Sequence, residues 1–65
     1  MKEKRTERVC RCFALPEGTQ FEKEGLYKWD YSIDGHVAFH ESGEQWDAGD
    51  IEFYQHFQII SGKHI

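Results

Sequence analysis

The feature that most constrains this chain is a strict alternation of apolar and polar side chains in residues 27–33, Tyr-Lys-Trp-Asp-Tyr-Ser-Ile. Successive side chains of a β-strand point to opposite faces, so this pattern predicts a strand with one buried face. Asp34-Gly35 follows, a dipeptide favoured in two-residue hairpins because both residues tolerate positive φ. The alternation resumes in residues 36–40, where we expect Val37 and Phe39 to face inward. Together these segments predict a β-hairpin.

Shorter β elements are expected on both sides of this hairpin. Residues 9–15, Val-Cys-Arg-Cys-Phe-Ala-Leu, form a β-favouring run that stops at the turn signal Pro-Glu-Gly. Residues 19–22, Thr-Gln-Phe-Glu, are interpreted as a further short strand. After the hairpin, Ser42-Gly43 predicts a turn that leads into Gln45 and Trp46.

Residues 50–57 fit either a strand or a helix, because their apolar side chains match both periods. Asp50 is a residue type that caps helix N-termini. We favour a short helical turn after Gly49, followed by a final strand near residues 57–61. Short strands with tight turns leave no room for helical crossovers. The predicted fold is therefore all-β: a small antiparallel meander or SH3-like barrel of about five strands, with one helical turn near 50–56.

The chain of 65 residues has room for one domain, which we place at residues 8–65 after a flexible basic arm at 1–7. A domain this small needs reinforcement. Ten aromatic residues supply it, since each ring can bury about 150–250 Å². Association into a homodimer is a second way to gain the same burial.

Cys10 and Cys12 would lie on one strand face with α-carbons about 6.5 Å apart, near the upper limit for a disulfide. Their side chains would run parallel, so we expect free thiols, which fit a reducing compartment. The charged N-terminus lacks the apolar run of a secretory signal, and no stretch approaches the ~20 apolar residues of a membrane span. We therefore expect a cytoplasmic protein with no membrane contact.

Charge is distributed unevenly along the chain. Residues 1–11 carry five cations against two acids, a net charge of +3, whereas residues 12–65 carry three cations against ten acids, a net charge of −7. An acidic body repels the phosphates of nucleic acids. The basic arm is suited to an acidic partner or to the body itself.

One segment resembles a known pattern. Leu15-Pro16-Glu17-Gly18-Thr19-Gln20-Phe21, followed by Gly25 and Tyr27, resembles the LP-x-GT-x-F…G…Y turn motif of small uncharacterised β proteins from phages and mobile elements. The resemblance covers residues 15–27 and implies an accessory protein. It implies no functional residues, and turn chemistry accounts for its Gly, Pro and Thr.

No pattern predicts catalysis or a cofactor. Two cysteines and four histidines supply enough side chains for a zinc site: Cys10, Cys12, His36, His40, His56 and His64. Zinc ligands are usually spaced by two to four residues, and Cys-x-Cys is tighter. His36 and His40 would lie about 13 Å apart along a strand. Arg11 would point to the opposite strand face from both thiols, and a chain this short cannot enclose a substrate pocket of about 300 Å³ or more without a second chain. We expect no metal and no enzyme activity.

The leading hypothesis is a protein-interaction module whose acidic surface binds a basic partner. Its candidate residues follow one another within a short stretch of the sequence: Glu41, Glu44, Trp46, Asp47, Asp50 and Glu52. Trp46 suits an interface anchor, although a cap on the open end of a barrel is the favoured interpretation. The alternative is nucleic-acid binding through Lys2, Lys4, Arg5 and Arg8, with Tyr27, Trp29 and Tyr31 stacking on bases. Against it, the same aromatic side chains are needed for the core.

Overall fold

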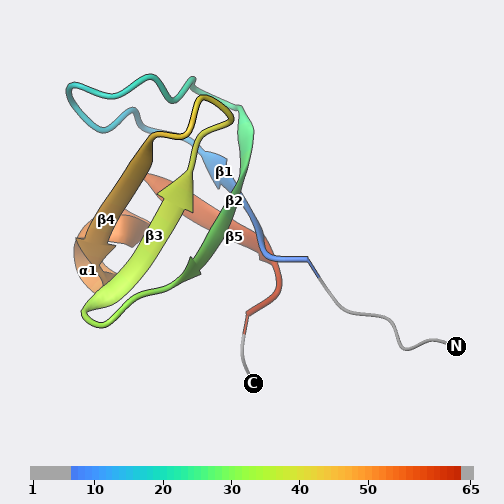
Figure 1. The fold of residues 1–65 in the computed structure, drawn as a ribbon, viewed down its shortest axis with the longest axis vertical. Coiled ribbons are helices and arrows are strands. Elements are labelled where there is room, and N and C mark those ends of the chain that lie inside the picture. Colours follow the sequence, from blue (N-terminus) through green and yellow to red (C-terminus); the bar gives the residue numbers. More distant parts are fainter. Residues whose placement is uncertain (1–6, 64–65) are drawn as a thin grey trace, which may run out of the picture.

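Five strands and one short helix make up the computed structural model, which describes residues 7–63. The elements are β1 (Val9–Cys12), β2 (Leu26–Tyr31), β3 (Gly35–Phe39), β4 (Gln45–Gly49), α1 (Asp50–Tyr54) and β5 (Phe57–Ser61). All strand pairs are antiparallel, and their order across the sheet is β4-β3-β2-β1-β5 (Figure 1). This confirms the predicted small all-β fold, including the helical turn after Gly49 and the final strand at residues 57–61.

Strand β2 belongs to two ladders. Its first half pairs with β1, its second half pairs with β3, and Lys28 takes part in both, opposite Val9 and opposite Phe39. Because β5 returns to the other edge of β1, the last strand lies beside the first, as in an SH3-like barrel. The sheet therefore curves around one core rather than lying flat.

The core faces of β2 and β3 correct one prediction. Trp29 is only 2% exposed and lies opposite Ala38, while Tyr31 lies opposite His36. Directly opposed residues in an antiparallel pair share a face, so Ala38 and His36 point inward. The expectation that Val37 and Phe39 face inward was wrong. It followed hydrophobicity within one segment, whereas the partner strand decides which face is buried.

The turn between β2 and β3 lies one residue earlier than predicted. Ser32 and Gly35 exchange both backbone hydrogen bonds, at 2.9 and 3.3 Å, so the loop residues are Ile33 and Asp34. Ile33, expected at the end of the strand's apolar face, is 98% exposed. Gly35 lacks positive φ and serves a different purpose. A Cβ there would contact the carbonyl oxygen of Ala48 and lie 2.7 Å from the Cα of Gly49, so only glycine permits β3 and β4 to meet this closely.

Residues 13–25 form a long loop, and the short strand predicted at 19–22 is absent from it. The loop is held by its own side chains. Thr19 Oγ1 donates to the carbonyl oxygen of Pro16 at 2.9 Å, Gly18 has a φ of +77°, and Phe21 is buried. Pro16, Gly18, Thr19 and Phe21 thus have structural roles in the loop, whereas Leu15 is 52% exposed. At the other end of the run, β1 stops at Cys12 rather than at residue 15.

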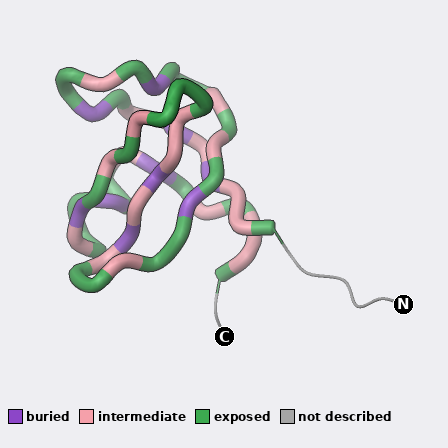
Figure 2. The backbone as a smooth tube through the Cα atoms, viewed as in Figure 1, coloured by how far each residue is buried: buried purple, intermediate pink, exposed green. Residues whose placement is uncertain are grey.

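Helix α1 begins after Gly49, which is its N-cap, so Asp50 is the first helical residue and does not cap the helix as predicted. The helix directs Phe53 into the core, where it stacks on Phe57 with ring centroids 5.1 Å apart. Figure 2 shows buried positions recurring along the strands and α1, with exposed turns between them. Phe53, Phe57, Cys10 and Cys12 are the largest fully buried side chains.

Most of the predicted basic arm, residues 1–6, lies outside the described residues. Glu7 is described, and its carbonyl oxygen accepts a hydrogen bond from Ser61 Oγ at 2.8 Å. Within residues 7–63, no helix is long and apolar enough to cross a membrane.

Candidate functional site

The acidic residues proposed for partner binding do not gather at one place. Glu41 and Glu44 lie in the turn between β3 and β4, whereas Asp50 and Glu52 lie in α1, beyond the opposite end of β4. Asp47 lies between them on β4, opposite Val37. The prediction of one acidic cluster relied on closeness in the sequence, but an extended strand separates the two groups in space.

Several of these carboxylates already have partners within the fold. Glu44 accepts a hydrogen bond from the backbone N–H of Gln20 at 2.9 Å, which ties the 13–25 loop to the β3–β4 turn. Asp47 accepts one from Ser32 Oγ at 3.2 Å. Glu41 and Glu52 are exposed, and their side chains have no hydrogen bond or ion pair within the described part of the chain. These two are the candidates with carboxylates available to a partner.

Trp46 packs against the core rather than standing out as an anchor. It is half-buried, and its ring lies 5.6 Å from that of Phe57 and 6.3 Å from that of Phe53, centroid to centroid. The rings of Trp46 and His56 pack edge to face, with their centroids 5.2 Å apart. The position matches the capping role favoured from the sequence.

Asp50 approaches a buried histidine. Its Oδ1 lies 3.1 Å from Nδ1 of His36, a side chain that is almost fully buried, although the approach lacks the geometry of a hydrogen bond. The imidazole stacks on Phe53 with centroids 4.8 Å apart, and its Nε2 lies 3.3 Å from the hydroxyl of Tyr54. His36 therefore serves as a packed core residue that joins β3 to α1.

A broader charge asymmetry appears once the fold is known. No Lys or Arg occurs between Lys28 and Lys63, and this interval includes β3, β4 and α1, which lie together on one side of the molecule (Figure 1). It contains seven acids: Asp30, Asp34, Glu41, Glu44, Asp47, Asp50 and Glu52. Within residues 7–63, only Asp30 among them pairs with an arginine, Arg8, at 3.2 Å. The β3–β4–α1 side is therefore acidic, and Lys63 partly offsets this charge where its Nζ lies 5.9 Å from the ring centroid of Tyr54 in α1.

Where β2 and β3 separate, a groove of about 700 Å³ opens on the surface. The ladder between them ends at Lys28 and Phe39, and before Lys28 the residues of β2 pair with β1 only. Cys12 N–H donates to the carbonyl oxygen of Gly25 at 3.0 Å, and Glu24 N–H donates to that of Cys12 at 2.6 Å. On the other side, the chain after Phe39 turns toward β4, since His40 N–H donates to the backbone carbonyl oxygen of Glu44 at 2.8 Å.

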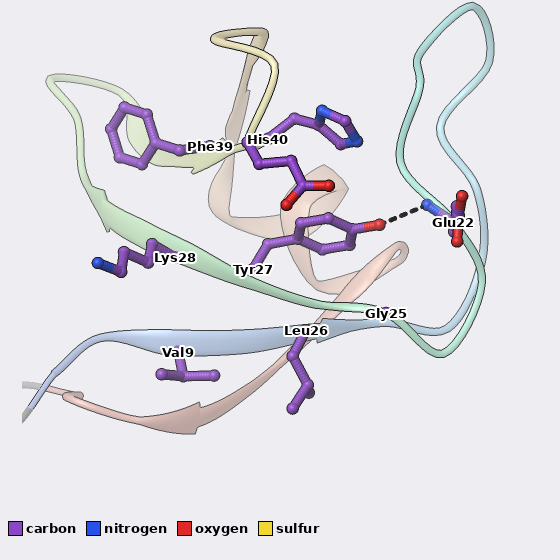
Figure 3. A pocket seen from close by; sticks show the side chains of 9 residues that line it. Val9, Glu22, Gly25, Leu26, Tyr27, Lys28, Phe39 and His40 are labelled. Atoms are coloured by element: carbon purple, nitrogen blue, oxygen red, sulfur yellow. Dashed lines mark hydrogen bonds between the residues drawn. The ribbon is translucent and has the colours of Figure 1, made fainter.

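Two rings bridge the separated strands on the core side of the groove. Tyr27 and His40 stack with centroids 5.6 Å apart, and Phe21 packs edge-on against both. The Tyr27 hydroxyl accepts a hydrogen bond from Glu22 N–H at 2.7 Å, as the dashed line in Figure 3 marks. The Tyr27 and His40 rings occupy the next position of the β2–β3 register, just beyond the last paired residues, Lys28 and Phe39.

The groove combines apolar walls with charged ends. Its lining residues are Val9, Glu22, Gly25, Leu26, Tyr27, Lys28, Phe39, His40 and Glu41. Leu26 is 63% exposed, although its neighbours Val9 and Phe39 are half-buried. In Figure 3, Phe39 and His40 lie above β2, and Val9 and Leu26 lie below it. Of the acidic residues proposed from the sequence for a basic partner, only Glu41 belongs to this groove, and Tyr27 of the nucleic-acid alternative also lines it. No local pattern connects these residues with the rest of the lining, because strand separation creates the site.

The basic residues of the alternative hypothesis are only partly visible. Lys2, Lys4 and Arg5 lie outside the described residues. Arg8 is described, and its guanidinium lies over the rings of Trp29 and Tyr31, 5.7 and 5.3 Å from their centroids, besides pairing with Asp30. Its positive charge is thus already engaged within the fold, and Trp29 is buried. Neither side chain is presented to a nucleic acid in this arrangement.

The two thiols are free and fully buried on one face of β1, as the strand alternation predicted. Burial raises the pKa of Cys10 to about 12, with the Cys12 thiol adding to the shift. The pKa of Cys12 is raised as well, mainly by burial. Both groups are therefore protonated at neutral pH and are poor nucleophiles. Within residues 7–63, no three His, Cys, Asp or Glu side chains lie close enough together to hold a metal ion.

Comparison with known proteins finds no matching family model, no matching curated protein and no matching solved structure. The resemblance of residues 15–27 to phage and mobile-element proteins stays a prediction.

Proposed function

We propose that this protein is an interaction module that binds a basic segment of another protein, with the groove between β2 and the end of β3 as its contact site. The observation that carries the proposal is the composition of that groove. It has apolar walls from Val9, Leu26 and Phe39, and the carboxylates of Glu22 and Glu41 belong to its lining.

Electrostatics favour a basic partner. Glu41 adjoins the acidic side formed by β3, β4 and α1, whose potential would attract and orient a cationic segment during encounter. Lys28 is the only Lys or Arg among the groove residues, at the end where the ladder closes. A cytoplasmic accessory role from a phage or mobile element, suggested by the turn motif, is part of the same proposal.

Charge reversal tests the proposal directly. The wild-type protein and the variant Glu41→Lys are immobilised, and the proteins captured from a cell extract are identified and quantified at several salt concentrations. A partner with a basic segment should bind the wild type and weaken as salt rises. Its capture by Glu41→Lys should fall roughly three- to tenfold, because an exposed attraction becomes a repulsion.

Glu17→Lys is the matched control, since Glu17 is exposed in the 13–25 loop, outside the groove lining, and the change in net charge is the same. Equal loss with Glu17→Lys would show that only net charge matters and would overturn the site. Equal capture by all three proteins, or no salt-sensitive partner at all, would overturn the function itself. Urea unfolding of each variant verifies that the fold is retained.

A further inference from the structure

The backbone of β2 has an open hydrogen-bonding edge where it borders the groove. The Gly25 carbonyl and the Trp29 N–H point toward β1, since the carbonyl accepts from Cys12 N–H at 3.0 Å and Trp29 N–H donates to the carbonyl oxygen of Arg8 at 3.1 Å. Backbone groups alternate between the two sides of a strand, so those of Leu26 and Lys28 face the β3 side. Lys28 meets Phe39 there.

After Lys28 and Phe39, the next hydrogen-bonded pair of that ladder would be Leu26 with Glu41, and this pair does not form. Strand β3 ends at Phe39, and no backbone hydrogen bond joins residues 26 and 41 in the part of the chain that the structure describes. The N–H and C=O of Leu26 therefore border the groove without a strand partner. Unpaired strand edges are templates for pairing with another chain.

The geometry points to strand addition as the binding mode: an extended segment of the partner enters the groove and pairs its backbone with Leu26. This inference rests on the proposed function and specifies how the same site recognises its ligand. Main-chain hydrogen bonds then supply affinity, and alternate side chains supply specificity. The partner segment should alternate apolar side chains, which pack on Leu26 and Phe39, with lysine or arginine, which meet Glu22 and Glu41.

A labelled peptide in which lysine and valine alternate is the probe, and fluorescence anisotropy measures its binding to the full chain. Two matched peptides accompany it, one with glutamate in place of lysine and one methylated at its backbone nitrogens. Strand addition predicts that backbone methylation weakens binding by roughly threefold or more for each hydrogen bond lost. The charge preference predicts no measurable binding of the glutamate peptide.

The protein side is tested with Leu26→Pro, which removes the one N–H proposed to donate to the peptide. Proline is tolerated on strand edges whose N–H faces solvent, and the Leu26 N–H has no strand partner in the fold. Leu26→Ser is the control, because it keeps the N–H and loses only the apolar side chain. The proline variant should bind at least threefold more weakly than the serine variant.

Amide hydrogen exchange gives a readout that does not depend on a variant folding. In the free protein the Leu26 amide should exchange much faster than that of Lys28, and saturating peptide should slow it. Equal binding of the methylated and parent peptides, or an unchanged Leu26 exchange rate, would overturn strand addition. If the preference for lysine over glutamate persisted in that case, the proposed function would stand; if it also vanished, or if the parent peptide did not bind, both would fall.

Discussion

The buried thiol of Cys10 makes the protein sensitive to alkaline conditions. Its pKa is raised by burial from 9.0 to about 12, so the unfolded chain releases this proton well before the folded chain does. The associated stability is fully present below pH 9 and is lost as the pH rises from 9 toward 12. Each pH unit in that window removes about 1.4 kcal/mol, which amounts to about 2 kcal/mol at pH 10.5. In a domain this small, such a loss lowers the melting temperature by about 8–16 °C.

Urea unfolding, followed by tryptophan fluorescence under reducing conditions at pH 7, 9 and 10.5, measures this loss. Cys10→Ala is the comparison, because the tyrosines, the lysines and Cys12 titrate in both proteins and only the wild type carries the Cys10 thiol. The free energy of unfolding of the wild type should fall about 2 kcal/mol more than that of the variant between pH 7 and pH 10.5. Parallel pH profiles for the two proteins would refute the reasoning.

Two further predictions concern the packing of the sheet. Gly35→Ala should destabilise the fold by about 1–3 kcal/mol, because its Cβ meets the backbone of β4. Gly49→Ala, whose Cβ has only Asp34 O near it at 3.7 Å, should lose less, about 0.5–1 kcal/mol, because alanine is a poorer N-cap than glycine. Urea titrations of both variants check this, and equal losses would contradict it. Ile33→Asn should change the free energy of unfolding by less than about 0.5 kcal/mol because Ile33 is solvated, whereas Phe53→Ala should lose about 3–5 kcal/mol. Thermal melts distinguish these two cases, and a strongly destabilised Ile33→Asn variant would show that the turn tip is packed.

Much of the architecture could be predicted because its signals are local. The alternation of residues 27–33 identifies the strand that carries Trp29. The helical turn after Gly49 is the favoured one of two interpretations, because the apolar period of residues 50–57 fits a strand as well. The inward face of residues 36–40 was misjudged because local hydrophobicity pointed to Val37 and Phe39. Strand pairing decides this face, and opposite Trp29 and Tyr31 it buries Ala38 and His36 instead.

The candidate site depended on contacts between distant segments. Glu41 was identified from charge alone, but its neighbours in the groove, Leu26, Phe39 and Glu22, come from segments up to nineteen residues away. They line one groove because the β2–β3 ladder ends at Lys28 and Phe39, while the backbone of Cys12 binds that of Gly25 just before β2. The other acids are close to Glu41 in the sequence, yet α1 and β4 carry Asp50 and Glu52 away from it.

The sequence by itself determined the alternating strand, the approximate positions of the turns and the charge asymmetry, because periodicity and turn chemistry depend on neighbouring residues. It left residues 50–57 open between strand and helix, because both periods fit them. Only the tertiary structure decided which side of β3 is buried, which carboxylates are already hydrogen-bonded, and where the sheet opens. These properties depend on strand register and on rings packed across the core, which bring together residues that no local pattern connects.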